Sequence, residues 1–123
     1  MTAILAIDDS PTIRAMLEGT LSRAGFDVTL AEDGVEGLSA HDDTAPDLII
    51  TDVNMPNLDG FGVIDGIRKD RGNMSTPILV LTTETGSQLR SRARDAGASG
   101  WITKPFDPEK LIAVIQRLTG AEG

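Results

Sequence analysis

The segment Leu48-Ile49-Ile50-Thr51-Asp52-Val53-Asn54-Met55-Pro56 decides the fold, because an apolar run inside it ends abruptly at a carboxylate. The four uncharged residues before Asp52 fit a buried strand, and the polar residues after it fit a loop. Three other apolar runs end at, or shortly before, chemically reactive side chains, which are Asp8 and Asp9, Thr82, and Lys104. We therefore expect several strands that carry their polar residues at one end.

Apolar runs alternate with segments of helical periodicity along the whole chain. The expected strands cover about residues 3–8, 27–31, 47–52, 78–82 and 101–103. Strict alternation of strands and helices predicts βα units and a parallel sheet. Right-handed crossovers leave few topologies, and the order 2-1-3-4-5 is common for five strands. We predict an α/β protein with a doubly wound (βα)5 flavodoxin-like fold, in one domain that spans residues 1–123.

Capping residues mark where the helices should start and stop. Ser10-Pro11 and Asp107-Pro108 each place an N-cap before a proline that suits the first helical position. Asp59 can cap the third helix, while Gly25 and Gly97 should end the first and fourth. Residues at helical spacing that should face the core are Ile13, Met16, Leu17, Leu21 and Ala24, then Phe61, Ile64 and Ile67, then Leu89, Ala93 and Ala96, and finally Leu111, Val114, Ile115 and Leu118.

The segment after the second strand carries weaker signals. A short helix should start near Gly34, and a polar, acidic loop should follow from His41 to Pro46. His41 is expected to be solvated in that loop. The methionines, including Met16, are interpreted as residues that fill gaps in the core.

The balance of charges excludes several functions. Eleven basic and 19 acidic residues give a formal net charge of −8. Such a field repels nucleic acid and anionic lipid, so we expect neither as a partner. Arg90, Arg92 and Arg94 form one basic patch, which we interpret as a solvated helix face that acidic partners could meet. The absence of cysteine excludes disulfides and thiolate metal sites. No signal peptide or membrane-spanning stretch is evident, which predicts a cytoplasmic protein.

The strand-end residues should meet where the winding of the sheet reverses. Asp8, Asp9 and Asp52 end the first and third strands, and Thr82 and Lys104 lie on the same rim. At an effective dielectric of about 20, two carboxylates about 4 Å apart repel by about 4 kcal/mol. Lys104 offsets part of this repulsion, and a hard cation with oxygen ligands would offset the rest. Mg²⁺ is therefore the predicted cofactor.

A carboxylate can also be a nucleophile that forms an aspartyl phosphate. Phosphoryl transfer needs in-line positioning and positive charge around the equatorial oxygens. Mg²⁺, Lys104 and the Thr82 hydroxyl could each contact one such oxygen. Asp52 is the best candidate for the nucleophile, because it lies between the acid pair and the side of the site that carries Thr82 and Lys104.

The motif set resembles the receiver domain of two-component response regulators. The matching pieces, which extend over essentially the whole chain, are Asp8-Asp9-Ser10, Asp52 to Gly60, Thr82, Gly97-Ala98-Ser99-Gly100 and Lys104-Pro105-Phe106. With no output domain in the sequence, the chain looks like a stand-alone CheY-type chemotaxis regulator. The resemblance implies a monomeric switch module rather than an enzyme, which catalyses only its own phosphorylation and dephosphorylation.

The resemblance also implies roles for individual residues. Asp52 would be the phosphoacceptor and also a metal ligand. Asp9 would bind Mg²⁺ directly, Asp8 mainly through water, and the backbone carbonyl of Asn54 would be a further protein ligand. Lys104 would pair with the phosphoryl group.

A second set of roles concerns switching and lifetime. Thr82 would be the switch hydroxyl, and Trp101 stands where the family usually has its switch tyrosine. Asn54 and Glu84 occupy the positions that tune the lifetime of the phosphoryl group, and they match fast-cycling chemotaxis regulators. Thr83 is bulkier than the alanine common beside the switch, which favours slower turnover.

The partners implied are a histidine kinase and a target that docks on the fourth helix, fifth strand and fifth helix, with the flagellar motor switch protein as one such target. A phosphate sink or relay shuttle without a motor target is the alternative. A flavodoxin-like carrier would need a phosphate-cradling loop where Asp8 and Asp9 repel phosphate. A phosphatase with an aspartate nucleophile would usually carry an acid where Asn54 stands.

Overall fold

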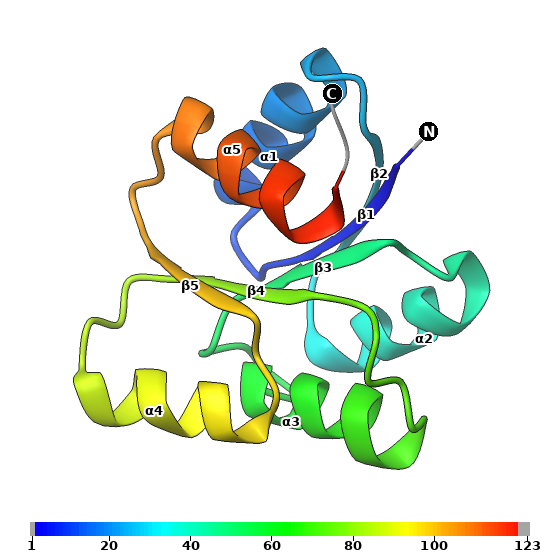
Figure 1. The fold of residues 1–123 in the computed structure, drawn as a ribbon, viewed down its shortest axis with the longest axis vertical. Helices are drawn as coiled ribbons and strands as arrows, with labels where there is room; N and C mark the ends of the chain where they lie inside the picture. The colour runs from blue at the N-terminus through cyan, green and yellow to red at the C-terminus, as the bar shows by residue number, and fades with distance from the viewer. Residues whose placement is uncertain (1, 121–123) are drawn as a thin grey trace.

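The computed structural model describes residues 2–120, which form a five-stranded parallel sheet between two layers of helices (Figure 1). The sheet order is β2-β1-β3-β4-β5, as the sequence predicts. The elements are β1 (Ala3–Ile7), α1 (Pro11–Arg23), β2 (Asp27–Ala31), α2 (Gly34–Thr44), β3 (Leu48–Thr51), α3 (Gly60–Asp65), the π-helical turn η1 (Gly66–Asp70), β4 (Ile78–Thr82), α4 (Ser87–Ala96), β5 (Gly100–Thr103) and α5 (Pro108–Thr119).

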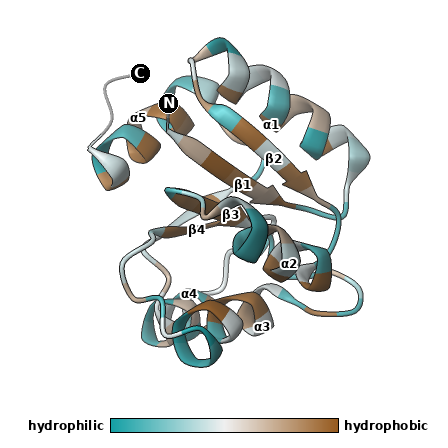
Figure 2. Ribbon diagram, turned by 90° about the vertical axis from the view of Figure 1, so that its right-hand side faces the viewer, coloured by the Kyte–Doolittle hydropathy of each residue, from teal (hydrophilic) through white to brown (hydrophobic). Residues whose placement is uncertain are grey.

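The sheet has a core on each face. Helices α1 and α5 cover one face, and α2, α3 and α4 cover the other (Figure 1). Along β1, Ile4 and Ala6 belong to the α1/α5 core, and Leu5 and Ile7 to the opposite core, because successive side chains of a strand point to opposite faces. The central strands β1, β3 and β4 are accordingly the hydrophobic ones (Figure 2). The edge strands β2 and β5 are only partly buried.

The predicted caps are confirmed. Ser10, Asp59 and Asp107 each accept a hydrogen bond from a backbone N–H in the first turn of the helix that follows. Gly97 ends α4 in the left-handed conformation, with φ 118°. These local signals therefore place the helices at the ends of the strands that carry the acids.

The loop predicted from His41 to Pro46 is wrong, because α2 continues to Thr44. It ends at Ala45, which adopts a left-handed conformation with φ 45°, and polar residues on its outer face do not interrupt it. The expectation of a solvated His41 is also wrong. Its side chain is only 12% exposed and makes contacts of 3.0 Å to Asp42 and 3.1 Å to Asn73.

Two further expectations need correction. Met16 is 45% exposed and Met74 is 73% exposed, so neither fills the core. Leu17 already occupies the inward side of α1, and its neighbour Met16 is turned about 100° away from it by the helix geometry. Arg92 is more than a solvated side chain, because its guanidinium lies 3.9 Å from the ring centroid of Phe61 in α3.

Within residues 2–120, no helix combines the length and the apolar character that crossing a membrane would require.

Candidate functional site

The ends of β1 and β3 bring three carboxylates together. Ile7 lies opposite Thr51 in the parallel register, so the next residues, Asp8 and Asp52, emerge side by side. The backbone N–H of Asp52 donates to the Ile7 carbonyl at 3.1 Å and fixes this arrangement. One carboxylate oxygen from each of Asp8, Asp9 and Asp52 lies within 4.8 Å of the other two. The acid cluster predicted from the strand ends therefore exists.

Lys104 reaches this cluster from the end of β5. Its Nζ donates to Asp8 Oδ2 at 2.6 Å and to Asp52 Oδ2 at 2.8 Å. The Lys104 backbone N–H donates to the Thr82 carbonyl, and the peptide bond to Pro105 is cis. Burial alone would lower the pKa of Lys104, but the hydrogen bonds and charges of Asp52 and Asp8 outweigh it and raise that pKa. The ammonium is therefore a permanent internal cation of the site at neutral pH.

The carboxylate oxygens differ in what they already bind. Asp8 accepts from the Ser10 N–H with one oxygen and from Lys104 with the other. Asp52 accepts from the Val53 N–H at 2.6 Å and from Lys104. Asp9 is exposed and, within residues 2–120, accepts no hydrogen bond. Its carboxylate is therefore the one most free to bind a cation directly.

The donor set fits Mg²⁺. It consists of three carboxylates, with no histidine or cysteine among the clustered residues, and Mg²⁺ prefers such oxygen ligands. Three carboxylates against the one ammonium of Lys104 leave two negative charges uncompensated. The backbone carbonyl of Asn54 also accepts no hydrogen bond from any part of the chain that the structure describes. It is available as a further oxygen ligand.

Thr82 lies on the same rim but is not bonded to the acids. It is fully buried at the end of β4, and its hydroxyl accepts from the Glu84 N–H at 3.3 Å. Glu84 in turn accepts from the Asn54 amide at 2.8 Å through its side chain. Its backbone carbonyl accepts from the Trp101 indole N–H at 3.3 Å. Thr83 is exposed and takes no part in this chain of bonds.

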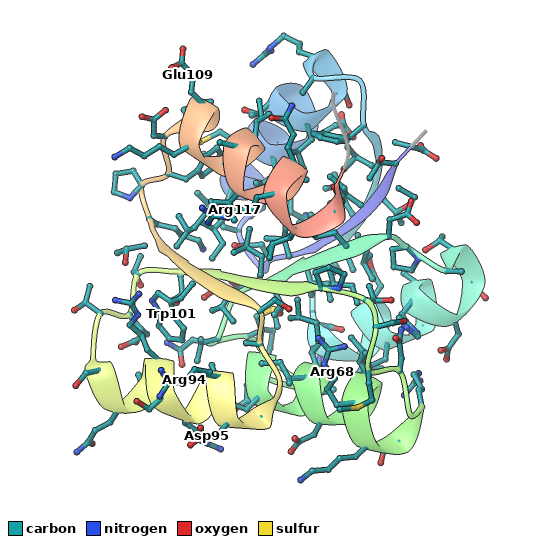
Figure 3. All side chains as sticks on the ribbon, viewed as in Figure 1. Arg68, Arg94, Asp95, Trp101, Glu109 and Arg117 are labelled. Atoms are coloured by element: carbon teal, nitrogen blue, oxygen red, sulfur yellow. The ribbon has the colours of Figure 1, made fainter. Side chains whose placement is uncertain are left out.

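Trp101 links the rim to a surface cavity. It is half-buried on β5 and lines a cavity of about 370 Å³ between β5 and α4. Figure 3 shows Trp101 above the helix that carries Arg94. Arg90 and Arg94 line this cavity too, and no acidic residue does. The cavity is therefore positively charged, in a chain whose net charge is negative.

Sequence reasoning missed two residues that hold loops of the site, and a third that holds the far end of α4. Arg14 donates to the Asp8 carbonyl at 2.8 Å and holds the loop after β1. Asn57 donates to Asp33 at 2.7 Å. Arg68, which Figure 3 labels beneath the sheet, is buried and donates to the Gly97 carbonyl at the end of α4. Only Asn57 had a local signal, because asparagine suits left-handed turn positions.

Comparisons with known proteins agree with this geometry. The family model for the response regulator receiver domain matches residues 4–116. Chemotaxis protein CheY1 of Helicobacter pylori is 39% identical over 121 residues, which cover 95% of this chain and 96% of that protein. Other curated relatives, 36% to 42% identical, are transcriptional regulators, and this chain spans about half of their length.

Solved structures lead to the same family. The Vibrio cholerae chemotaxis protein CheY4 superposes with a TM-score of 0.90 at 43% identity, covering 96% of this chain and 98% of that one. The receiver domain of sensor histidine kinase PA1611 from Pseudomonas aeruginosa has a magnesium ion coordinated in its active site cleft. It superposes with a TM-score of 0.88 at 29% identity, covering 98% of both chains. This chain therefore belongs to the response regulator receiver domain family of two-component signalling.

Proposed function

We propose that this protein is a phosphorylation-operated switch that accepts a phosphoryl group from a histidine kinase on Asp52, with Mg²⁺ as cofactor. The observation that carries the proposal is the double contact of Lys104 with Asp8 and Asp52. It leaves Asp9 free beside them as a cation ligand. The same ammonium can pair with a phosphoryl oxygen once Asp52 is modified.

The chemistry follows from how Asp52 is held. The Val53 N–H holds one of its oxygens and the Lys104 ammonium pairs with the other, which approaches phosphorus in line as Lys104 releases it. That oxygen forms the new P–O bond, the P–N bond of a phosphohistidine breaks, and the departing imidazole takes up a proton. The Lys104 ammonium then pairs with one phosphoryl oxygen. The Thr82 hydroxyl leaves the Glu84 N–H and bonds a second phosphoryl oxygen. Bound Mg²⁺ would supply positive charge for the remaining oxygen.

Each metal role has support in the hydrogen bonding. Asp9, which accepts no hydrogen bond from the described chain, would bind Mg²⁺ directly. Asp8, whose carboxylate is almost fully buried and bonded to the Ser10 N–H and to Lys104, would act through water. Asp52 and the Asn54 carbonyl would complete the protein ligands. The receiver domain of PA1611, which coordinates magnesium in its cleft, supports a metal in this position.

Asn54, Glu84 and Thr83 are proposed to set the lifetime of the phosphoryl group. The Asn54–Glu84 hydrogen bond joins the loop after β3 to the loop after β4. Asn54 and Glu84 stand two residues after Asp52 and Thr82 respectively. Thr83 adds bulk at an exposed position of the second loop.

The target is proposed to dock on α4, β5 and α5. The cavity lined by Arg90, Arg94 and Trp101 suits an acidic segment of a partner protein. The similarity to CheY1 and CheY4 favours chemotaxis control and the flagellar motor switch protein as target. A phosphate sink or relay shuttle without a motor target is the second candidate. The net charge of −8 opposes direct binding of nucleic acid.

Labelling with acetyl phosphate tests the acceptor. With Mg²⁺, intact-mass measurement should find one added phosphoryl group, stable in acid and labile in base. Asp52→Asn should gain none. Asp47→Asn is the matched control, because Asp47 begins the same strand segment at the opposite end of the sheet, where it bonds the Ala3 N–H. A full label on the Asp52→Asn protein would show that another residue is the acceptor.

The choice between motor regulator and phosphate sink needs a binding experiment. Beryllofluoride with Mg²⁺ can stand in for the phosphoryl group. A motor regulator should retain the motor switch protein on a column only in this form. A short acyl-phosphate lifetime without any retention would favour the sink.

A further inference from the structure

The loop from Val53 to Asp59 carries the acceptor's neighbours and is tethered on two sides. On one side, Asn54 donates to Glu84 in the loop after β4. On the other side, Asn57 Nδ2 donates to Asp33 Oδ2 at 2.7 Å, in the loop before α2. The first tether lies at a lifetime-tuning position. The second has no part in the proposed chemistry, yet it holds the same loop.

Asp33 is a rigid anchor for the second tether. Its other oxygen, Oδ1, accepts from the Glu36 N–H at 2.8 Å and caps α2. The backbone hydrogen bond from Glu36 and the amide of Asn57 together lower the pKa of Asp33. The carboxylate is therefore held from both sides in its charged form. Its position is fixed by the start of a helix rather than by a mobile loop.

Asn57 is unusual in its backbone. Its φ is 68°, in the left-handed region, which costs less for asparagine than for most residues other than glycine. Its side chain can reach Asp33 only because the turn Pro56-Asn57-Leu58 adopts this conformation. The Leu58 N–H closes the turn by donating to the Pro56 carbonyl at 2.7 Å. The hydrogen bond and the strained turn therefore support each other.

Close packing completes the contact between the loop and α2. A side chain at Gly34 would collide with the backbone carbonyl of Leu58. The first residue of α2 thus touches the loop directly. Any shift of the turn at Asn57 must either move α2 or break the bond to Asp33. Asn54 lies three residues before Asn57 in the same loop.

We propose that Asp33 and Asn57 form a positioning pair, which holds the loop so that the Asn54 carbonyl faces the acid cluster and thereby sets the affinity for Mg²⁺. Neither residue contacts the ion. The inference rests on the proposed function, because it takes Asp9, Asp52 and the Asn54 carbonyl as metal ligands. Groups that hydrogen-bond metal ligands typically change metal affinity by about 10- to 100-fold when they are removed, and a pair that acts through the loop backbone should lie at the lower end of that range.

The first test is Asn57→Gly, measured by calorimetric titration of the phosphate-free protein with MgCl₂. Glycine tolerates the left-handed conformation at no steric cost and removes the amide, although it also frees the backbone, which the exchange of side chains below does not do. The dissociation constant for Mg²⁺ should rise by about tenfold. An unchanged constant would overturn the inference.

An exchange of the two side chains provides the matched control. Asn57→Asp alone places two carboxylates against each other and should weaken Mg²⁺ binding at least as much as Asn57→Gly. Adding Asp33→Asn restores one amide and one carboxylate, with the same net charge, and asparagine still caps a helix. The double variant should recover affinity toward the native value. Failure to recover would contradict the role of the pair.

A merely structural role gives a different pattern. It would lower the free energy of unfolding in EDTA and leave Mg²⁺ affinity untouched. The proposed role also predicts that, in EDTA, the backbone N–H groups present within residues 54–58 exchange faster in Asn57→Asp than in the native protein. The double variant should return this exchange to the native rate.

Asp9→Asn separates this inference from the proposed function. If Asp9→Asn leaves Mg²⁺ affinity unchanged, the metal site itself is wrong, and the positioning pair with it. If Asp9→Asn weakens binding while Asn57→Gly does not, only the positioning pair is wrong.

Discussion

Lys104 governs the charge of the acid cluster, because within residues 2–120 its ammonium is the one cation bonded to both Asp8 and Asp52. The side chains of Lys104, Asp8 and Asp52 are 9%, 2% and 11% exposed, so water screens them little. Removing one partner of such a buried pair leaves the other charges uncompensated. Lys104 therefore stabilises the fold, in addition to the role proposed for it in pairing with the phosphoryl group. Stability measured in EDTA, without phosphorylation, isolates the first of these roles.

Lys104→Met should destabilise the metal-free protein by about 3 kcal/mol, because it leaves two buried carboxylates facing each other. Urea unfolding in EDTA measures the loss. Added Mg²⁺ should return more stability to this variant than to the native protein, since the ion replaces the missing positive charge. Lys69→Met is the control, because Lys69 is exposed, forms a 3.7 Å pair with Asp65 and should change stability by less than about 0.5 kcal/mol. Equal losses of unfolding free energy in Lys104→Met and Lys69→Met would contradict the stabilising role of Lys104.

The raised pKa of Lys104 fixes how the difference in unfolding free energy between the native protein and Lys104→Met depends on pH. A group whose pKa is higher in the folded state stabilises the fold fully below its unfolded pKa, which is about 10.4 for lysine. That contribution is lost as pH rises through the folded pKa. The stability gap between the native protein and Lys104→Met should therefore stay constant from about pH 6 to 9 and narrow only above about pH 10.4. A gap that closed near neutral pH would mean that Lys104 is not held as an ammonium.

At the scale of elements, the helices differ in how firmly they begin. The N-caps Ser10, Asp33, Asp59 and Asp107 all accept a hydrogen bond from the first turn of their helices. The N-cap of α4 is Gly86, which has no side chain to do so. Of the two helices proposed to meet partners, α4 therefore begins less firmly than α5.

Gly86→Ser should stabilise the protein by about 0.5–1 kcal/mol, because serine supplies a cap and restricts the unfolded chain. The backbone of Gly86, with φ −65° and ψ 133°, suits serine, and a Cβ there meets nothing within 4 Å. Urea unfolding and hydrogen exchange of the first turn of α4 are the measurements. Gly25→Ser is the control, because φ 91° makes a side chain costly there and stability should fall. A first turn that exchanged no more slowly in Gly86→Ser would refute the cap.

Local signals of this kind explain which elements the sequence could reveal. Caps, prolines and strand-terminal acids act within a few residues, so the starts of α1, α3 and α5 were predictable. The end of α2 was not, because Ala45 stops the helix in a left-handed conformation usually taken by glycine. The π-helical turn η1 was also not predictable from the sequence. It contains the buried Arg68, whose partners Asn73 and Gly97 lie 5 and 29 residues away.

For the whole molecule, the sheet order was predictable because strict alternation and right-handed crossovers leave few topologies, and 2-1-3-4-5 is common among them. The order then brings together strand-end residues as distant as Asp8 and Lys104. Contacts between loops were not predictable, since each depends on how two flexible segments meet. Asn54 with Glu84 and Asn57 with Asp33 are such contacts. Only the three-dimensional positions of the side chains reveal these two contacts.

One loop-to-loop path joins Thr82, on the rim of the proposed acceptor site, to the face proposed for partners, and Trp101 reports on it. Thr82 accepts from the Glu84 N–H, and the Glu84 carbonyl accepts from the indole of Trp101. Trp101 is the single tryptophan and the chain has no tyrosine, so its emission reports one place. If the Thr82 hydroxyl turns to a phosphoryl oxygen, it gives up the Glu84 N–H and vacates space beside the ring. The indole can then leave its half-buried position and move inward.

Beryllofluoride with Mg²⁺ should therefore shift the emission of Trp101 to the blue. Asp52→Asn should show no shift, because the mimic has no acceptor. Thr82→Ala should bind beryllofluoride, as fluorine NMR can verify, yet leave the emission unchanged, since the linking hydroxyl is gone. The shift is a change in population between two packings, so a partner that prefers the inward indole must also favour the phosphorylated form. An unshifted spectrum with the mimic bound to the native protein would instead assign Trp101 to the core alone, and the coupling to α4 would have to run through the Asn54–Glu84 bond.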